Sequence, residues 1–155
     1  MSVTENKRTI TLFADEFFSK GNYGVKDQIY APGYVDHTPM FGLPPTADGV
    51  EQALRTLRAA FPDQKATVSE IVPVDEDAAV VFFKIEATHK GAFGGMPATG
   101  RHVEYPGLSF VRFAADGRCI ESWIFRDDLE LFRQLGALPA STQVSPTQQP
   151  APPAI

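Results

Sequence analysis

The sequence contains a single cysteine, Cys119, so it can form neither an internal disulfide nor a cysteine-rich zinc site. It also lacks any apolar run near the ~20 residues that cross a bilayer, and residues 1–20 show no signal-peptide pattern. Lys and Arg (14) are outnumbered by Asp and Glu (19), and the net charge of −5 disfavours a nucleic-acid partner. These absences predict a small cytoplasmic protein that binds neither nucleic acid nor membrane.

The 155 residues suit one domain, but they are not uniform in composition. All 12 Phe, 4 Tyr and 1 Trp, and every charged residue, lie before residue 134. Residues 140–155 contain four prolines and no aromatic or charged residue, which leaves too little apolar surface to offset the cost of ordering them. We therefore predict one domain at residues 1–139 and a disordered tail at residues 140–155. The number of aromatics in the domain is a first indication of an apolar pocket.

The first half of the domain has the periodicity of helices. Apolar residues from Ile10 to Phe18 share one side of a helix that should end at Gly21. A shorter helix is expected over residues 25–30, because residues that precede a proline leave the helical region. The clearest pattern runs from residue 50 to residue 61, with Asp48 as the expected N-cap and Pro62 closing the helix.

The second half changes to the two-residue period of strands. Four segments rich in Val, Ile, Phe and Thr are separated by turn residues, at 66–74, 77–90, 101–114 and 118–126. A last short helix is expected over residues 128–135, with Gly136 ending it. Helices followed by strands predict an α+β fold, in which helices pack on one face of an antiparallel sheet.

Three stretches carry a resemblance to a known family. They are YAPGYVDHTP at residues 30–39, THKGAFGGMPATGRHV at residues 88–103 and GRCIESWIFRDDLELFRQLGA at residues 117–137. Together the chain resembles the SnoaL-like polyketide cyclases, or "ester cyclases", of the nuclear transport factor 2-like superfamily, over residues 9–138. The resemblance implies a cone-shaped α+β fold, with a curved sheet wrapped by helices around a deep pocket. It also implies ring closure by intramolecular aldol condensation without a metal or organic cofactor.

The resemblance places an acid four residues after the strand tryptophan, which here is Asp127 after Trp123. A carboxylate in an apolar pocket can serve as the general base that an aldol cyclisation needs. Trp123 and Phe125 share its strand face and would provide the apolar surroundings. The alternative is a helix N-cap, since Asp127 and Glu130 have the spacing of a capping box. Asp128 could cap the helix equally well, which would free Asp127 for catalysis.

His37 is the second candidate catalytic residue. In the pocket it could hydrogen-bond the substrate carbonyl and stabilise the enolate that forms when a proton leaves. The alternative is a loop histidine satisfied by local backbone. The neighbouring Asp36 is expected to be structural, accepting hydrogen bonds from turn amides.

The expected substrate-binding residues are mostly aromatic, because aromatic side chains suit a polycyclic ligand. They are Tyr34, Trp123, Phe125, Phe17, Phe61 and, at the rim, His102. His89 and His102 flank the loop at residues 91–100, but no spacing here matches a metal-ligand pattern. The loop also lacks the order of a phosphate-binding motif. The apolar residues at its tip are compatible with three roles: a lid over the ligand, a contact with another subunit, or an ordinary hairpin loop.

The functional hypothesis is a cofactor-free cyclase acting on a hydrophobic polyketide or related polycyclic metabolite, with Asp127 as base and His37 as oxyanion partner. The same groups could serve an isomerase, a dehydratase or an epoxide hydrolase, and a non-catalytic small-molecule-binding module is the alternative of another class. We also expect a homodimer or higher homo-oligomer, because an apolar sheet face opposite the helices should be covered.

Overall fold

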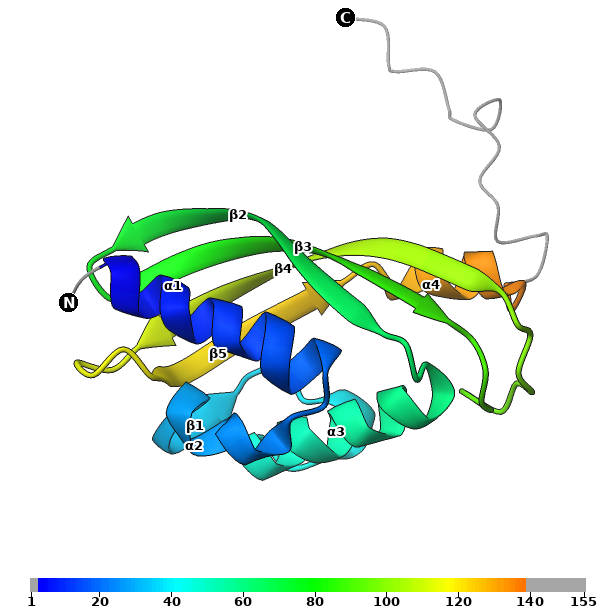
Figure 1. Ribbon diagram of the computed structural model, residues 1–155, viewed down its shortest axis with the longest axis horizontal. Helices are drawn as coiled ribbons and strands as arrows, with labels where there is room; N and C mark the ends of the chain where they lie inside the picture. The colour runs from blue at the N-terminus through cyan, green and yellow to red at the C-terminus, as the bar shows by residue number, and fades with distance from the viewer. Residues whose placement is uncertain (1–2, 139–155) are drawn as a thin grey trace, which may run out of the picture.

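The computed structural model describes residues 3–138 and has the α+β fold predicted from the sequence (Figure 1). The helical segments are α1 (Val3–Leu12), its π-helical continuation η1 (Phe13–Ser19), η2 (Tyr23–Val25), α2 (Lys26–Ile29), η3 (Met40–Gly42), α3 (Ala47–Ala60) and α4 (Asp128–Leu135). The strands are β1 (Tyr30–Asp36), β2 (Lys65–Asp75), β3 (Ala78–Thr88), β4 (His102–Phe113) and β5 (Cys119–Arg126). The predicted tail, residues 140–155, lies outside the described residues.

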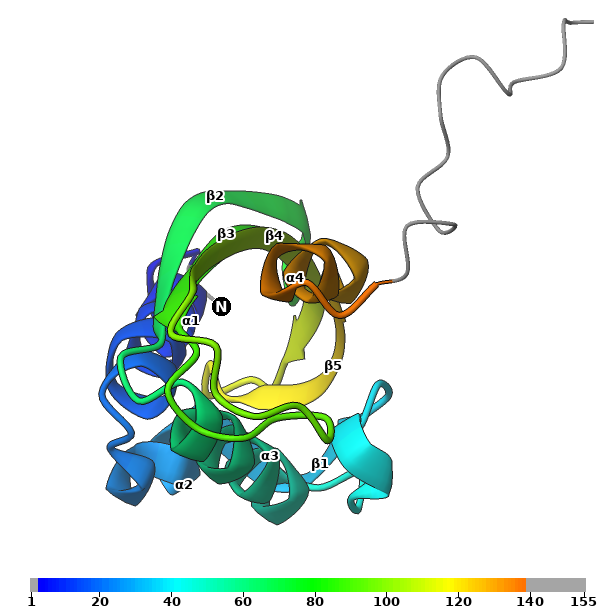
Figure 2. The same cartoon turned by 90° about the vertical axis from the view of Figure 1, so that its right-hand side faces the viewer.

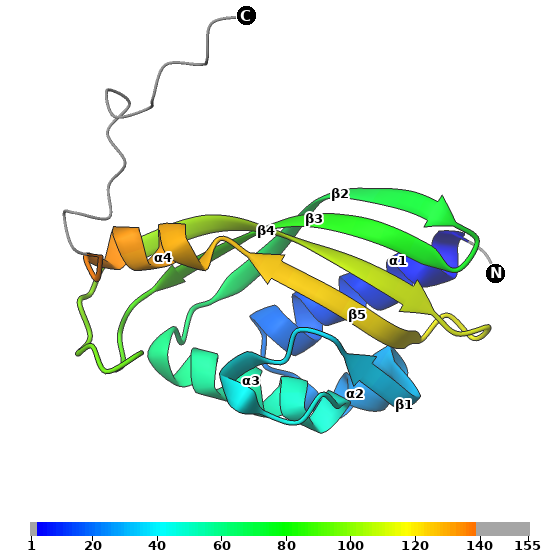
Figure 3. The same ribbon diagram turned by 180° about the vertical axis from the view of Figure 1, so that it is seen from behind.

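The five strands form one sheet in the order β1-β5-β4-β3-β2. Strands β2 to β5 pair antiparallel, as predicted, but β1 runs parallel to β5 along the edge of the sheet (Figure 3). The expectation of a purely antiparallel sheet was therefore wrong. The sequence predicts a helix over residues 25–30 that ends before Pro32, and it predicts no strand directly after that helix. An edge strand tolerates a proline, and the register of β1 shifts between Tyr30 and Val35 to accommodate it.

The sheet is strongly curved, and its concave face is covered by α1, α2 and α3 (Figure 2). Alternate strand residues point to this face because side chains alternate across a strand. The main core lies here, and Phe17, at 0% exposure, is its most enclosed side chain. Helix α4 closes one end of the curved sheet (Figure 2), and its buried Leu131 and Leu135 belong to the main core. None of the helices described within residues 3–138 covers the outer face of β3, β4 and β5 (Figure 1).

Helix ends follow local capping rules, with one correction. Helix α3 begins earlier than predicted, because the side chain of Thr46 accepts a hydrogen bond from the backbone N–H of Gly49 and so replaces Asp48 as N-cap. Helix α4 ends as predicted at Gly136, whose φ of 78° is the left-handed conformation that favours glycine at a C-terminus. Within residues 3–138 we find no helix with the length and apolar character needed to span a membrane.

Candidate functional site

A cavity of about 120 Å³ lies between the concave face of the sheet and the N-terminal helices. Residues from α1, η1, α3 and all five strands line it, and most of them are apolar. The lining residues with polar side-chain atoms are Thr9, Tyr30, Asp36, Thr38, Ser109, Cys119, Ser122 and Arg126. An apolar cavity with a few polar groups is the usual form of a small-molecule site.

Asp36 is the only acidic residue, and Arg126 the only basic one, among the described residues that line the cavity. They come from neighbouring parallel strands, since Asp36 pairs with Ser122 in the β1–β5 register and Arg126 ends β5. No ion pair joins the two side chains within residues 3–138. The cavity therefore holds one carboxylate and one guanidinium that do not pair with each other.

The carboxylate of Asp36 is held in place by the turn that follows it. Its Oδ1 accepts hydrogen bonds from the backbone N–H of Thr38 at 2.9 Å and from the Thr38 hydroxyl at 3.3 Å. The same hydroxyl oxygen accepts from the backbone N–H of Ile124 at 2.8 Å, which ties the turn to β5. The expected Asx-type turn is confirmed. Oδ2 makes no hydrogen bond within the described residues, so this oxygen remains free to act as a base.

Tyr30 lines the same cavity and supplies a hydroxyl group. Its ring packs against Tyr34 with 4.4 Å between ring centroids, and the hydroxyl makes no hydrogen bond within residues 3–138. Burial raises the pKa of Tyr30 well above its ordinary value, and the nearby Tyr34, Cys119 and Asp36 raise it further. The hydroxyl therefore stays protonated and can donate a hydrogen bond to a ligand oxygen.

Cys119 also faces the cavity, but it does not have the properties of a nucleophile. Burial raises the pKa of its thiol, and its Sγ donates a hydrogen bond to the carbonyl oxygen of Glu121. A neutral thiol is a poor nucleophile, because the thiolate is the reactive form. Cys119 therefore contributes to the apolar lining.

The mouth of the cavity lies between η3 and the end of β5. A shallower outer pocket of about 410 Å³ shares Thr38, Met40, Ile124 and Arg126 with the cavity. Residues common to both pockets mark the passage between them. Asp128, the first residue of α4, also lines the outer pocket, so the passage opens beside the start of that helix.

None of the eight site residues predicted from the sequence is among the residues that line this cavity. Asp127 is the N-cap of α4: its Oδ1 accepts a hydrogen bond of 3.0 Å from the backbone N–H of Glu130, and its side chain is exposed. The capping alternative is thus the one seen in the structure, and Asp128 lies inside the helix rather than capping it. Whether Asp127 also acts in catalysis stays a prediction.

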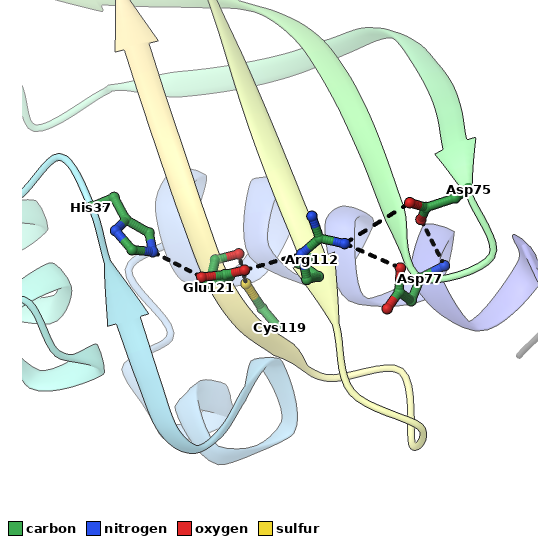
Figure 4. A network of polar contacts seen from close by, with 6 residues as sticks. All are labelled: His37, Asp75, Asp77, Arg112, Cys119 and Glu121. Carbon is green, nitrogen blue, oxygen red and sulfur yellow. Dashed lines mark hydrogen bonds and ion pairs between the residues drawn. The ribbon is translucent and has the colours of Figure 1, made fainter.

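His37 lies on the outer face of the sheet. Its Nε2 is 2.9 Å from a carboxylate oxygen of Glu121, and its ring stacks on Trp123 with centroids 3.9 Å apart. Glu121 also accepts from Nε of Arg112, which in turn reaches Asp77 (Figure 4). This polar chain crosses β1, β5 and β4 and ends at the β2–β3 turn. His37, which belongs to this polar chain, and Trp123, on which it stacks, therefore lie on the side of the sheet away from the cavity.

The remaining predicted residues lie around the cavity. Phe125 is exposed on the outer face and lines the outer pocket, and His102 is an exposed strand-end residue opposite Thr88. Phe17 and Phe61 belong to the core. Tyr34 does not line the cavity, but its hydroxyl is 2.6 Å from the hydroxyl of Ser122, a lining residue.

The loop after β3 is fixed to the body of the protein. The fully buried His89 accepts a hydrogen bond at Nδ1 from the backbone N–H of Thr99, and Phe93 at the loop tip packs against Phe61 and Phe132. The loop thus has the contacts of a packed hairpin connection. In the described part of the chain no three His, Cys, Asp or Glu side chains gather as a metal site would require.

The sequence predicted only a structural role for Asp36 and no site role for Arg126, for an identifiable reason. The inward face of β5 is set by residues 122, 124 and 126, whereas the predicted base and its aromatic neighbours have odd numbers. Recognising β1 as a strand would have placed Asp36 opposite Ser122, on the inward face. The sequence pattern does not indicate β1 as a strand, because Pro32 and Gly33 interrupt its periodicity.

Comparisons with known proteins agree with this architecture. A family model described as SnoaL-like polyketide cyclase matches residues 8–135. A solved structure from Acidithiobacillus ferrooxidans, described as that of a polyketide cyclase, is similar at 31% identity, with a TM-score of 0.75 over 88% of this chain and 98% of that one. IdmH, described as a polyketide cyclase from Streptomyces antibioticus, is also 31% identical, with a TM-score of 0.74 over 84% and 98% of the two chains. TsrD from Streptomyces laurentii shares the fold at 24% identity, with a TM-score of 0.79 over 89% and 99%. The comparison with curated proteins found no match.

Proposed function

Because the chain belongs to the SnoaL-like polyketide cyclase family, we propose that it is an acid–base enzyme that closes a ring in a hydrophobic, polyketide-like molecule. The reaction would be an intramolecular aldol-type condensation that needs no cofactor. The observation that carries this proposal is the apolar cavity in which one carboxylate, that of Asp36, lies with the protonated hydroxyl of Tyr30. A base and a neutral donor in an apolar site are the two groups that enolate chemistry requires.

In the proposed mechanism, the free oxygen of Asp36 takes a proton from a carbon next to a substrate carbonyl. The electron pair moves to the carbonyl oxygen, which Tyr30 stabilises by donating a hydrogen bond. The enolate carbon then attacks a second carbonyl of the same molecule, a carbon–carbon bond forms, and the new alkoxide takes the proton back from Asp36. The Thr38 turn keeps the carboxylate oriented through these steps.

The first test measures proton abstraction alone, so that it does not depend on the natural substrate. β-Tetralone, a bicyclic ketone, is incubated with the protein in deuterium oxide, and loss of its acidic protons is followed by NMR. Asp36→Asn keeps the oxygen that Thr38 contacts but removes the basic one. We expect the catalysed exchange to fall by roughly 10²–10⁴, the usual contribution of a positioned base, while β-tetralone still binds.

The same assay distinguishes the two carboxylates and the two classes of function. Asp127 remains the alternative base predicted from the sequence, and Asp127→Asn is the matched variant. If Asp127→Asn abolishes exchange and Asp36→Asn does not, Asp127 is the base. If the wild-type protein binds β-tetralone but never exchanges its protons, the chain is a binding module and the enzymatic proposal fails.

We also propose that a second copy of the chain covers the outer face of the sheet. Phe82, Leu108 and Phe125 pair across β3, β4 and β5 and form a row of large apolar side chains that are 38–55% exposed. A two-fold axis through this row would place each copy of it on the other, as an isologous interface requires. The cytoplasmic location stays a prediction from the sequence.

A further inference from the structure

Arg126 is a charged residue placed where an apolar cavity meets its mouth. It lies on the inward face of β5, lines both the cavity and the outer pocket, and its side chain is only 14% exposed. A guanidinium that is largely removed from water is costly unless its donors find acceptors. The contacts of Arg126 therefore decide whether the group is structural or is available to a ligand.

The partners of Arg126 within residues 3–138 leave part of the guanidinium free. Nε is 3.5 Å from a carboxylate oxygen of Asp128, which is longer than a good hydrogen bond, and the Asp128 side chain is 52% exposed. Nη1 contacts the thioether sulfur of Met40, a weak acceptor. Nη2 makes no hydrogen bond within the described residues. A weak ion pair of this kind contributes little to stability, so a structural role leaves the position of Arg126 unexplained.

We propose that Arg126 binds a carboxylate carried by the ligand, so that the substrate is an amphipathic acid with its apolar body in the cavity and its carboxylate at the mouth. The inference rests on the proposed function and adds to it the chemical class of the substrate. Arginine suits this task, because its planar donors match the geometry of a carboxylate and its charge is permanent. The described lining holds two acidic residues, Asp36 in the cavity and Asp128 at the outer pocket, and the Asp128 side chain is 52% exposed, so water screens its charge.

The placement of Arg126 also orients the ligand relative to Asp36. Asp36 pairs with Ser122, and Arg126 follows four residues later on the same strand, about 13 Å farther along at the usual rise of a strand. A ligand anchored by its carboxylate at Arg126 would extend into the cavity toward Asp36. The acidic carbon that Asp36 deprotonates should then lie at the end of the ligand remote from the carboxylate.

The test uses β-naphthoate and methyl β-naphthoate, which share one apolar body and differ in charge. Binding of each is measured by titration calorimetry to the wild-type full chain. We expect the wild type to bind the carboxylate at least tenfold more tightly than the ester. Arg126→Gln should remove this preference by weakening β-naphthoate about 10–100-fold, as expected for loss of a hydrogen bond to a charged group. The same variant should bind the ester unchanged, which shows that the cavity is intact.

Arg133→Gln is the matched control, because Arg133 lies on α4 with its side chain 54% exposed and paired with Glu130. It removes the same charge without touching the cavity, and it should keep the preference for the carboxylate. Equal affinity of the wild type for both probes would overturn the inference about Arg126 and leave the proposed function standing. Failure of both probes to bind, together with no exchange on β-tetralone, would overturn both.

Discussion

The side chain of Asp127 accepts a hydrogen bond from the backbone N–H of Glu130 and thereby caps α4. The reciprocal half of a capping box is absent, because the Glu130 carboxylate pairs with Arg133 and Gln134, and the N–H of Asp127 donates to the carbonyl oxygen of Pro106. Asp127 thus performs a structural task that a neutral amide can perform as well. Asp127→Asn therefore keeps the cap and removes only the carboxylate, so the contribution of Asp127 to stability can be measured apart from any contribution to catalysis.

The cap predicts different results for two substitutions of Asp127. Asp127→Asn should leave the free energy of unfolding near that of the wild type, because Asn and Asp cap about equally well. Asp127→Ala should lower it by about 1 kcal/mol, the usual effect of losing an N-cap. Urea denaturation measures both. If the Asn variant is destabilised as much as the Ala variant, the carboxylate charge matters and the cap does not account for the position.

The hydroxyl of Tyr30 predicts a defect in catalysis without a defect in folding. Tyr30→Phe removes a group that bonds no described residue, so the free energy of unfolding should stay close to that of the wild type. The exchange of β-tetralone protons should fall by about 10²–10³, the effect of removing one oxyanion donor.

Tyr34→Phe is the matched control for Tyr30. Its hydroxyl shares a buried hydrogen bond with Ser122, so the substitution should lower stability by about 1 kcal/mol. It should leave the exchange rate largely unchanged. The reversed result, in which Tyr34→Phe slows exchange and Tyr30→Phe does not, would assign the donor role to Tyr34. That outcome would agree with the sequence-based prediction that Tyr34 binds the substrate.

The polar chain on the outer face predicts a loss of stability in acid. Hydrogen bonds from His37 and then from Arg112 hold the pKa of Glu121 below its ordinary value of 4.5. A group with a lowered folded-state pKa stabilises the fold above its unfolded-state pKa, and that stabilisation is lost as the pH falls through the folded-state pKa. The stability difference between the wild type and Glu121→Gln should therefore be largest near neutral pH, at most about 1 kcal/mol for such exposed pairs, and vanish in acid below pH ~4.

Urea denaturation at pH 7 and in acid measures this difference. Glu70→Gln offers a control, since Glu70 lies on the edge strand β2 and is exposed. Its effect on stability should be small at both pH values. A difference for Glu121→Gln that stays constant into acid would show that the carboxylate charge does not stabilise the fold.

Much of the fold followed from the sequence, because its helices and long strands have strong periodicity. The segment from residue 50 to residue 61 indicated α3, and Gly136 marked the end of α4 at the observed residue. The site did not follow in the same way. Whether a strand residue faces the cavity or the outer surface depends on the pairing of β1 with β5, a contact between residues some 90 positions apart. Local periodicity places Trp123 and Phe125 on one face but does not say which face is inward.

The last prediction concerns the outer face of the sheet. The row of Phe82, Leu108 and Phe125 exposes more apolar surface than isolated side chains do, and such a patch marks an interaction site. We expect the wild type to sediment as a species of twice the chain mass at micromolar concentration. Leu108→Asp, at the centre of the row, would bury two unpaired charges in a two-fold interface and should give a species of one chain mass. Val74→Asp is the control, because Val74 is also an exposed apolar residue, on β2, but lies outside the row, and it should not change the mass. A wild type that sediments as one chain would leave the row uncovered by a second copy and contradict the proposed interface.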